Sequence, residues 1–289
     1  MTRGLTAELA LAAEALLAES PRWDAATGRL LWADVPAGTV HSFDPVSGVD
    51  ERIPVGTEVG TVVPHAGGGQ MLGVRTGFAW LRPDGALDTV AEIDQPGLRM
   101  NDGVCAPDGA FWAGSMAFDG TPGAGTLYRL GPDGVAAPRL AGVTVSNGIG
   151  FTADGARFYY ADTPTLRVDV CEVDADDQTV LSRRPFVTLA EGRPDGLALD
   201  DDGCVWVAAI RSGRVLRFTP SGVLDTVVRL PEPWPTSCAF GGSDGATLFI
   251  TTARTLKSER RDTPGGGGIF AVRPGVTGPA ALPYRPAPP

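Results

Sequence analysis

Short apolar stretches separated by turn residues recur along the whole chain. Each has four to six residues, carries an aromatic or bulky aliphatic side chain, and several end on a small or acidic residue. Apolar runs of this length bounded by turn residues are typical of β-strands. The pattern therefore predicts six equivalent strands, at residues 30–34, 71–74, 110–114, 157–162, 204–208 and 247–251.

A second apolar strand follows most of these stretches after a turn. The second strands are predicted at residues 39–43, 126–130, 214–218 and 268–272, and turns such as Ser47-Gly48 and Asp133-Gly134 follow several of them. The 39 glycines and 25 prolines of the chain are scattered in short clusters, which indicates many tight turns and hence many short strands.

The strand pairs repeat at a long and nearly constant period. With one reference residue in each first strand, successive reference residues are separated by 41, 39, 47, 47 and 43 positions: Leu31, Leu72, Phe111, Phe158, Val205 and Leu248. A β-sandwich has no reason to repeat at this period, whereas a unit of roughly 40–50 residues is typical of a propeller blade. The sequence predicts an all-β fold, a six-bladed β-propeller that forms one domain over residues 1–289. Ring closure should pair a strand within residues 6–17 with residues 269–272, and the Pro-rich residues 279–289 should form an extended tail.

Polar residues begin a further strand that precedes the first strand of most repeats. Five of them precede the reference residues of their repeats by 12, 9, 11, 10 and 11 positions: Glu19, Asp102, Asn147, Asp195 and Ser237. Similar offsets mean similar places in different blades, so these groups should meet at one mouth of the central channel. Carboxylate and amide oxygens suit a hard divalent cation. The alternative is that Asn-Gly and Asp-Gly simply form turns, but a set in register favours a metal site in the channel.

Composition narrows the remaining possibilities. The chain has 34 acidic and 24 basic residues, a formal net charge of -10, which disfavours nucleic-acid and anionic membrane partners. Glu14 interrupts the apolar run near the start, and no run of about 20 apolar residues exists to span a bilayer. The cysteines lie far apart and should be buried thiols of a cytoplasmic protein. His41, expected at the surface, and His65, expected to be structural, leave few candidates for a catalytic triad.

Motifs in a fixed order carry a resemblance to a known family. From Glu19 to Pro283 the chain resembles the gluconolactonase and regucalcin (senescence marker protein) family of six-bladed propellers. The motifs, weak singly and specific together, are Glu19-Ser20-Pro21-Arg22-Trp23, Arg99-Met100-Asn101-Asp102-Gly103, Gly114-Ser115-Met116, Val145-Ser146-Asn147-Gly148, Pro194-Asp195-Gly196, Gly213-Arg214-Val215, Thr236-Ser237-Cys238-Ala239-Phe240-Gly241-Gly242 and Gly267-Gly268-Ile269-Phe270.

The resemblance implies a set of site residues. Glu19, Asn147 and Asp195 match the positions that bind one divalent metal, with calcium as the expected ion and zinc, manganese or magnesium as alternatives. Arg99 and Asn101 match positions that contact a sugar lactone, and Asn101 also lies near the metal. Asp119 stands where the family has a longer Glu, which points to a smaller or less polar lactone.

The implied activity is metal-dependent opening of a small-molecule lactone to its hydroxy acid. Asp195 would orient or deprotonate the attacking water, and Arg99 would supply fixed positive charge. One alternative is a phosphotriester or fluorophosphate hydrolase, because a similar propeller family uses a comparable metal site. The other is a non-catalytic calcium-binding propeller, since many propellers only present surfaces.

Overall fold

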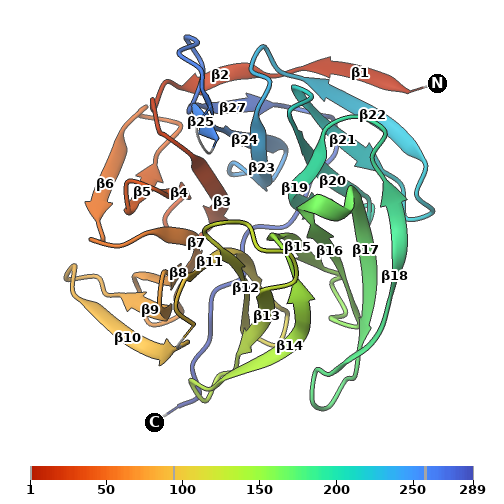
Figure 1. Cartoon of the computed structure of the whole chain (residues 1–289). Coiled ribbons are helices and arrows are strands. Elements are labelled where there is room, and N and C mark those ends of the chain that lie inside the picture. The colour runs from red at the N-terminus through yellow and green to blue at the C-terminus, as the bar shows by residue number, and fades with distance from the viewer. Residues whose placement is uncertain (1, 94, 257–258, 289) are drawn as a thin grey trace.

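The computed structural model describes residues 2–93, 95–256 and 259–288. Six of its sheets are arranged around a central axis, as Figure 1 shows, so the predicted six-bladed β-propeller is confirmed. The helical content of the described residues is one 3-10 turn, Thr163–Thr165, and no helix among them is long and apolar enough to cross a bilayer.

Four blades are built from consecutive strands, and in each the first strand lies nearest the axis (Figure 1). They are β3 (Ala18–Asp24), β4 (Arg29–Asp34), β5 (Thr39–Phe43) and β6 (Asp50–Pro54); β7 (Val59–Pro64), β8 (Gln70–Val74), β9 (Gly77–Leu81) and β10 (Leu87–Glu92); β11 (Leu98–Cys105), β12 (Phe111–Ala117), β13 (Gly125–Leu130) and β14 (Ala136–Val143); and β15 (Ser146–Phe151), β16 (Arg157–Asp162), β17 (Arg167–Val173) and β18 (Val180–Thr188).

The other two blades also use the N-terminus. The fifth contains β19 (Arg193–Leu199), β20 (Val205–Ile210), β21 (Arg214–Phe218), β22 (Leu224–Arg229) and β1 (Arg3–Thr6). The sixth contains β23 (Pro235–Gly241), β24 (Thr247–Thr252), β27 (Ile269–Val272) and β2 (Glu8–Leu11), and a small hairpin, β25 (Thr255–Leu256) and β26 (Glu259–Arg260), projects from it. We call β3, β7, β11, β15, β19 and β23 the inner strands.

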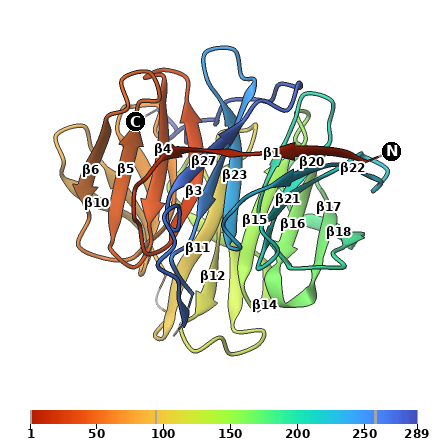
Figure 2. The same cartoon turned by 90° about the horizontal axis from the view of Figure 1, so that it is seen from above.

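The N-terminus closes the ring as predicted and also extends it. Strand β2 pairs antiparallel with β27, which places Glu8 opposite Ala271. This pairing confirms the expected closure and covers an edge that would otherwise be open. Strand β1 pairs in parallel with β22, an addition that the short polar sequence of residues 3–6 did not predict. Figure 2 shows β1 and β2 continuing one another along the rim of two blades.

Aromatic side chains of the second strands fill the spaces between blades. Trp112 of β12 is buried and packs edge-on against Phe151 of the next blade, with ring centroids 5.4 Å apart. Trp206 of β20 packs in the same way against Phe240, at 5.7 Å. Because radially arranged sheets bury both faces, the sequences of these second strands are nearly continuous apolar runs. The four cysteines are buried and unpaired, as predicted.

His41 is the first clear disagreement with the sequence analysis, which placed it at the surface. Its ring stacks on Trp32 at a centroid distance of 3.6 Å, and only 4% of the residue is exposed. Its Nδ1 lies 2.8 Å from Oδ2 of Asp50. The alternation of β5 put His41 on one face of the sheet, but both faces of a propeller blade are covered by neighbours, so alternation did not indicate exposure.

The C-terminal residues 277–288, here called the strap, cross one face of the ring. Figure 1 shows this segment running past the axis. The backbone amide of Ala281 donates to the carbonyl of Trp23 at 3.0 Å, and that of Tyr284 to the carbonyl of Pro64 at 2.9 Å. The Tyr284 side chain is 2% exposed, and its hydroxyl donates to the carbonyl of Gly131. The strap is extended but firmly attached.

Candidate functional site

Every inner strand loses its pairing register with the second strand near its N-terminal end. The register shifts between Glu19 and Arg22, between Met100 and Gly103, and at matching places in the other blades: Val59/Thr61, Ser146/Ile149, Pro194/Leu197 and Pro235/Ser237. Such bulges turn side chains away from the regular alternation. All five polar residues that the repeat offset singled out lie at these bulges. We call this end of the channel the site mouth.

The Asn-Gly and Asp-Gly pairs are parts of bulged strands and not hairpin turns. Gly148 lies in β15 and Gly196 in β19. A Cβ atom on Gly148 would lie 2.5 Å from the carbonyl oxygen of Asp195, and one on Gly196 would overlap Ser237. Glycine is therefore required because neighbouring inner strands approach closely at the site mouth, which excludes the simple turn interpretation for these two pairs.

Replacing Gly148 by alanine is expected to destabilise the fold by about 2 kcal/mol, because the new methyl group must push β15 away from β19. Guanidinium denaturation would measure the change. Gly4→Ala is the matched control, since its Cβ would meet only the flexible end of Arg229 at 3.0 Å. Equal unfolding free energies for the two variants would contradict the close approach.

Glu19 and Asp195 place two carboxylates in the site mouth. Glu19 is 8% exposed and Asp195 is 4% exposed. Burial, reinforced by the charge of Asp102, raises the pKa of Glu19 to about 8. Burial also raises the pKa of Asp195 well above its ordinary value, with further contributions from the negative charges of Glu19 and Asp102. Glu19, Asp102 and Asp195 come from three different blades, so acidic groups of separate blades influence one another at the site mouth.

Two asparagines of neighbouring blades contact each other at the site mouth. Nδ2 of Asn101 donates to Oδ1 of Asn147 at 3.1 Å and to the carbonyl of Ser146 at 2.7 Å. Arg99 Nη1 donates to Oδ1 of Asn101 at 2.7 Å. Burial lowers the pKa of Arg99, while the carboxylates of Glu19, Glu58 and Asp195 favour its charged form. The structure therefore brings Glu19, Arg99, Asn101, Asn147 and Asp195 together.

Several oxygens here lack the partners that buried polar groups normally have. Among the described residues, Asp195 Oδ1, Asp102 Oδ2 and Ser237 Oγ accept or donate no hydrogen bond. Unpaired buried acceptors are costly. No group of three His, Cys, Asp or Glu side chains in the described ranges is arranged to hold a metal. A cation at the site mouth would therefore need the amide oxygen of Asn147 beside the carboxylates of Glu19 and Asp195, and this all-oxygen set fits a hard divalent ion.

Asp119 is the candidate residue that the structure does not bring into this cluster. It is exposed in the loop after β12, and its Oδ1 accepts hydrogen bonds from the amide and the hydroxyl of Thr121, at 2.8 and 2.7 Å. These bonds lower the pKa of Asp119. The loop lies at the same end of the channel as Arg99, because Ala117 pairs with Leu98.

Three residues near the cluster were not singled out as site residues from the sequence. Glu58, just before β7, supplies the acidic group of the second blade, but it precedes Leu72 by 14 residues and so falls outside the common offset. Thr163 accepts a hydrogen bond from Asn147 Nδ2 and donates one to the carbonyl of Pro194, both at 2.8 Å. Arg22 pairs with Asp102 at 3.1 Å, and its place in the first motif was the available signal.

Comparison with known proteins agrees with this architecture. Residues 17–254 match the family described as SMP-30/Gluconolactonase/LRE-like region. The chain belongs to this family. It is 37% identical to a 6-deoxy-6-sulfogluconolactonase of Pseudomonas putida over 91% of this chain and 93% of that one, and 34% identical to regucalcin of Bos taurus over 92% and 94%.

A solved structure shows the same fold as this family member. The structure of a calcium-binding protein, regucalcin, from Agrobacterium tumefaciens superimposes with a TM-score of 0.91 at 26% identity, covering 99% of both chains. The resemblance that the motifs indicated is thereby confirmed, and the named relatives include a lactonase and a calcium-binding protein.

Proposed function

We propose that this protein is a divalent-metal-dependent lactonase that opens a sugar lactone or a related small lactone to its hydroxy acid. The observation that carries the proposal is the pair of buried carboxylates, Glu19 and Asp195, at the site mouth, with Asp195 Oδ1 unpaired and Arg99 beside them. Family membership and a relative named as a lactonase support it.

Glu19, Asn147 and Asp195 would hold the cation. Calcium is our first choice because a regucalcin structure is described as calcium-binding, and zinc, manganese and magnesium also accept oxygen ligands. When bound, the cation supplies positive charge that polarises the carbonyl group of a lactone. Asn147 is already oriented for this role, because Thr163 fixes its Nδ2 and leaves Oδ1 on the side of Asn101.

The chain's own groups account for the proton transfers of the reaction. Asp195 Oδ1 would accept a proton from a water molecule while the oxygen of that water molecule bonds to the carbonyl carbon of the lactone. The ring C–O bond then breaks, and the departing ring oxygen takes up the proton that Asp195 received. The guanidinium of Arg99 is held in place by Asn101 and by the carbonyl of Met100, and it would stabilise negative charge that develops on the lactone.

Substrate contacts are assigned to Arg99, Asn101 and Asp119. Asn101 lies one hydrogen bond from Asn147 and one from Arg99, between the proposed metal ligand and the cationic group. Thr121 donates hydrogen bonds to Oδ1 of Asp119. The other carboxylate oxygen, Oδ2, would accept a hydrogen bond from a substrate hydroxyl at the edge of the site mouth. Because one relative is named as a sulfogluconolactonase, aldonolactones with an anionic substituent belong among the substrates to test.

The cytoplasmic location stays a prediction.

The test is a pH-indicator assay of lactone hydrolysis on metal-stripped protein, with calcium, magnesium, manganese and zinc restored separately. The panel should include aldonolactones, sulfonate-bearing aldonolactones and plain alkyl lactones, with aryl phosphotriesters as the competing class. We expect a cation to restore turnover of at least one lactone. Turnover of phosphotriesters alone would favour the phosphotriesterase alternative, and cation binding without any turnover would favour a non-catalytic calcium-binding propeller.

A further inference from the structure

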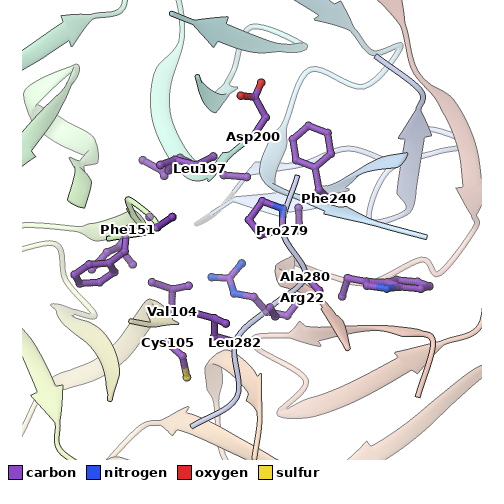
Figure 3. A pocket seen from close by; sticks show the side chains of 18 of the residues that line it. Arg22, Val104, Cys105, Phe151, Leu197, Asp200, Phe240, Pro279, Ala280 and Leu282 are labelled. Atoms are coloured by element: carbon purple, nitrogen blue, oxygen red, sulfur yellow. The ribbon is translucent and has the colours of Figure 1, made fainter. Parts of the chain in front are cut away.

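A cavity lies toward the opposite end of the channel from the site mouth. It has a volume of about 500 Å³ and lies where the inner strands end, as Figure 3 shows. Along four inner strands, one wall residue follows the cluster residue by four positions: Trp23 after Glu19, Cys105 after Asn101, Phe151 after Asn147 and Leu199 after Asp195. Four residues of strand span about 13 Å, which places these wall residues at the far end of the inner strands. Other lining residues, Ile149 and Leu197, follow Asn147 and Asp195 by two positions, so the cavity begins below the proposed active site and extends to the opposite end of the strands.

The walls of this cavity are mainly apolar. The inner strands contribute aliphatic and aromatic side chains, among them Val104, Ile149, Phe151, Leu197, Leu199 and Phe240. The thiols of Cys105 and Cys238 also line it, and burial raises the pKa of both, so that neither is a reactive thiolate. Pockets for small organic molecules have similar sizes, roughly 300–1,000 Å³, and similar walls.

The strap covers the cavity from outside. Pro279, Ala280 and Leu282 of the strap face the inner-strand residues across it in Figure 3. The strap is attached on one side of this stretch by Gly278, whose amide donates to Gly245, and on the other by the buried Tyr284. A molecule in the cavity would therefore contact the strap on one side and the ends of the inner strands on the other.

One buried polar group is directed into this apolar space. Figure 3 shows the guanidinium of Arg22 in the middle of the lining side chains. Its Nη2 donates to Asp102 Oδ1 at 3.1 Å and to the carbonyl of Gly103 at 2.6 Å, and its Nη1 donates to the carbonyl of Pro21 at 2.7 Å. Its Nε has no partner among the described residues, although Arg22 is only 5% exposed. Because an unpaired buried donor is unfavourable, a ligand with an acceptor oxygen would gain binding energy from Nε.

The charges around the cavity favour an uncharged ligand. The charge of Arg22 is already balanced by Asp102, and that of Asp200 by Arg217 at 2.7 Å. Asp201, exposed at the rim, adds a negative charge. A carboxylate would bring a further negative charge beside these groups, whereas a neutral carbonyl oxygen can accept the free Nε–H without that repulsion.

From these observations we infer that the strap end of the channel is a second binding site, for an uncharged, largely apolar small molecule with one acceptor oxygen that pairs with Arg22 Nε. The inference does not depend on the lactonase proposal, because the two sites lie at opposite ends of the inner strands.

Three molecules of similar shape test the chemistry: benzophenone has an acceptor oxygen, diphenylmethane lacks it, and diphenylacetate carries a negative charge. We expect benzophenone to bind saturably to the full-length protein in calorimetry, and the other two to bind about tenfold more weakly or not at all. Irradiation of bound benzophenone should attach it to peptides that contain Leu197–Leu199, Phe240 or the strap.

Two variants test the location. Leu199→Trp fills the cavity from β19, and Leu282→Trp fills it from the strap, where Leu282 is 37% exposed and tolerates a larger side chain. Each should weaken benzophenone binding at least about tenfold while lactone turnover stays unchanged. Leu224→Trp, at a 36% exposed leucine of β22 outside the cavity, is the matched control and should bind normally.

Absence of saturable benzophenone binding, equal affinity for diphenylmethane, or labelling elsewhere on the protein would each overturn the inference. If Leu199→Trp fails to fold, Leu282→Trp alone decides the location. If the unmodified protein binds benzophenone as expected but turns over no lactone, only the proposed function is contradicted, so the two proposals fail separately.

Discussion

Asp195→Asn is expected to lower kcat/KM for lactone hydrolysis about 10³-fold, near the middle of the range for loss of a general base. Asparagine has the same shape as aspartate, so the bulge of β19 should persist. The change removes the negative charge that would help to hold a cation. It also removes the carboxylate, the group of Asp195 that can take up a proton. Steady-state kinetics with saturating metal, together with calorimetric titration of the cation, would separate the two losses.

Asp162→Asn provides a control for this variant. Asp162 is also buried at the site mouth, but its carboxylate accepts hydrogen bonds from the backbone amides of Thr144 and Val145. The variant should keep kcat/KM within a few-fold of the unmodified protein once it is folded. If Asp195→Asn retains both cation binding and turnover, the role assigned to Asp195 is wrong.

The repeat carried most of the information about the fold. Residues 39–43 and 214–218 were predicted as strands and form β5 and β21 with the same bounds. Period and turn residues suffice for this because each blade is a local structure with short connections. Strand β1 was not predicted because residues 3–6 are short and mostly polar, so they contain no apolar run that could be matched to a blade. The burial of His41 was not predicted because neighbouring blades cover both faces of a sheet. Alternation of polar and apolar residues along a strand does not indicate this.

The site was predictable wherever the repeat placed equivalent residues in register. Glu19, Asn147 and Asp195 have similar offsets within their repeats and lie at equivalent bulges, and the structure brings them to one mouth. Glu58 was missed because it precedes its strand instead of lying within it. The pairing of Arg22 with Asp102 joins two blades, and an offset within one repeat contains no information about which side chains meet across blades.

The burial of Glu19 and Asp195 also affects the stability of the folded protein. In metal-stripped protein the pKa of Glu19 lies near 8, above its ordinary 4.5, and that of Asp195 is raised in the same direction. The folded state then holds protons that the unfolded state has released, so the free energy of unfolding should fall as the pH rises from about 5 to about 8.

A divalent cation should reverse this loss, because it replaces the proton as the partner of the carboxylates. A cation at about a thousand times its dissociation constant stabilises the folded state by about 4 kcal/mol. For a protein of this size the midpoint of thermal unfolding should rise by about 10 °C at slightly alkaline pH. Calorimetric scans across pH, with and without calcium, would measure both effects. Glu19→Gln should flatten the pH dependence and abolish the calcium shift, since glutamine fills the same volume without charge. A midpoint that ignores calcium, magnesium, manganese and zinc at every pH would contradict a cation site at Glu19 and Asp195.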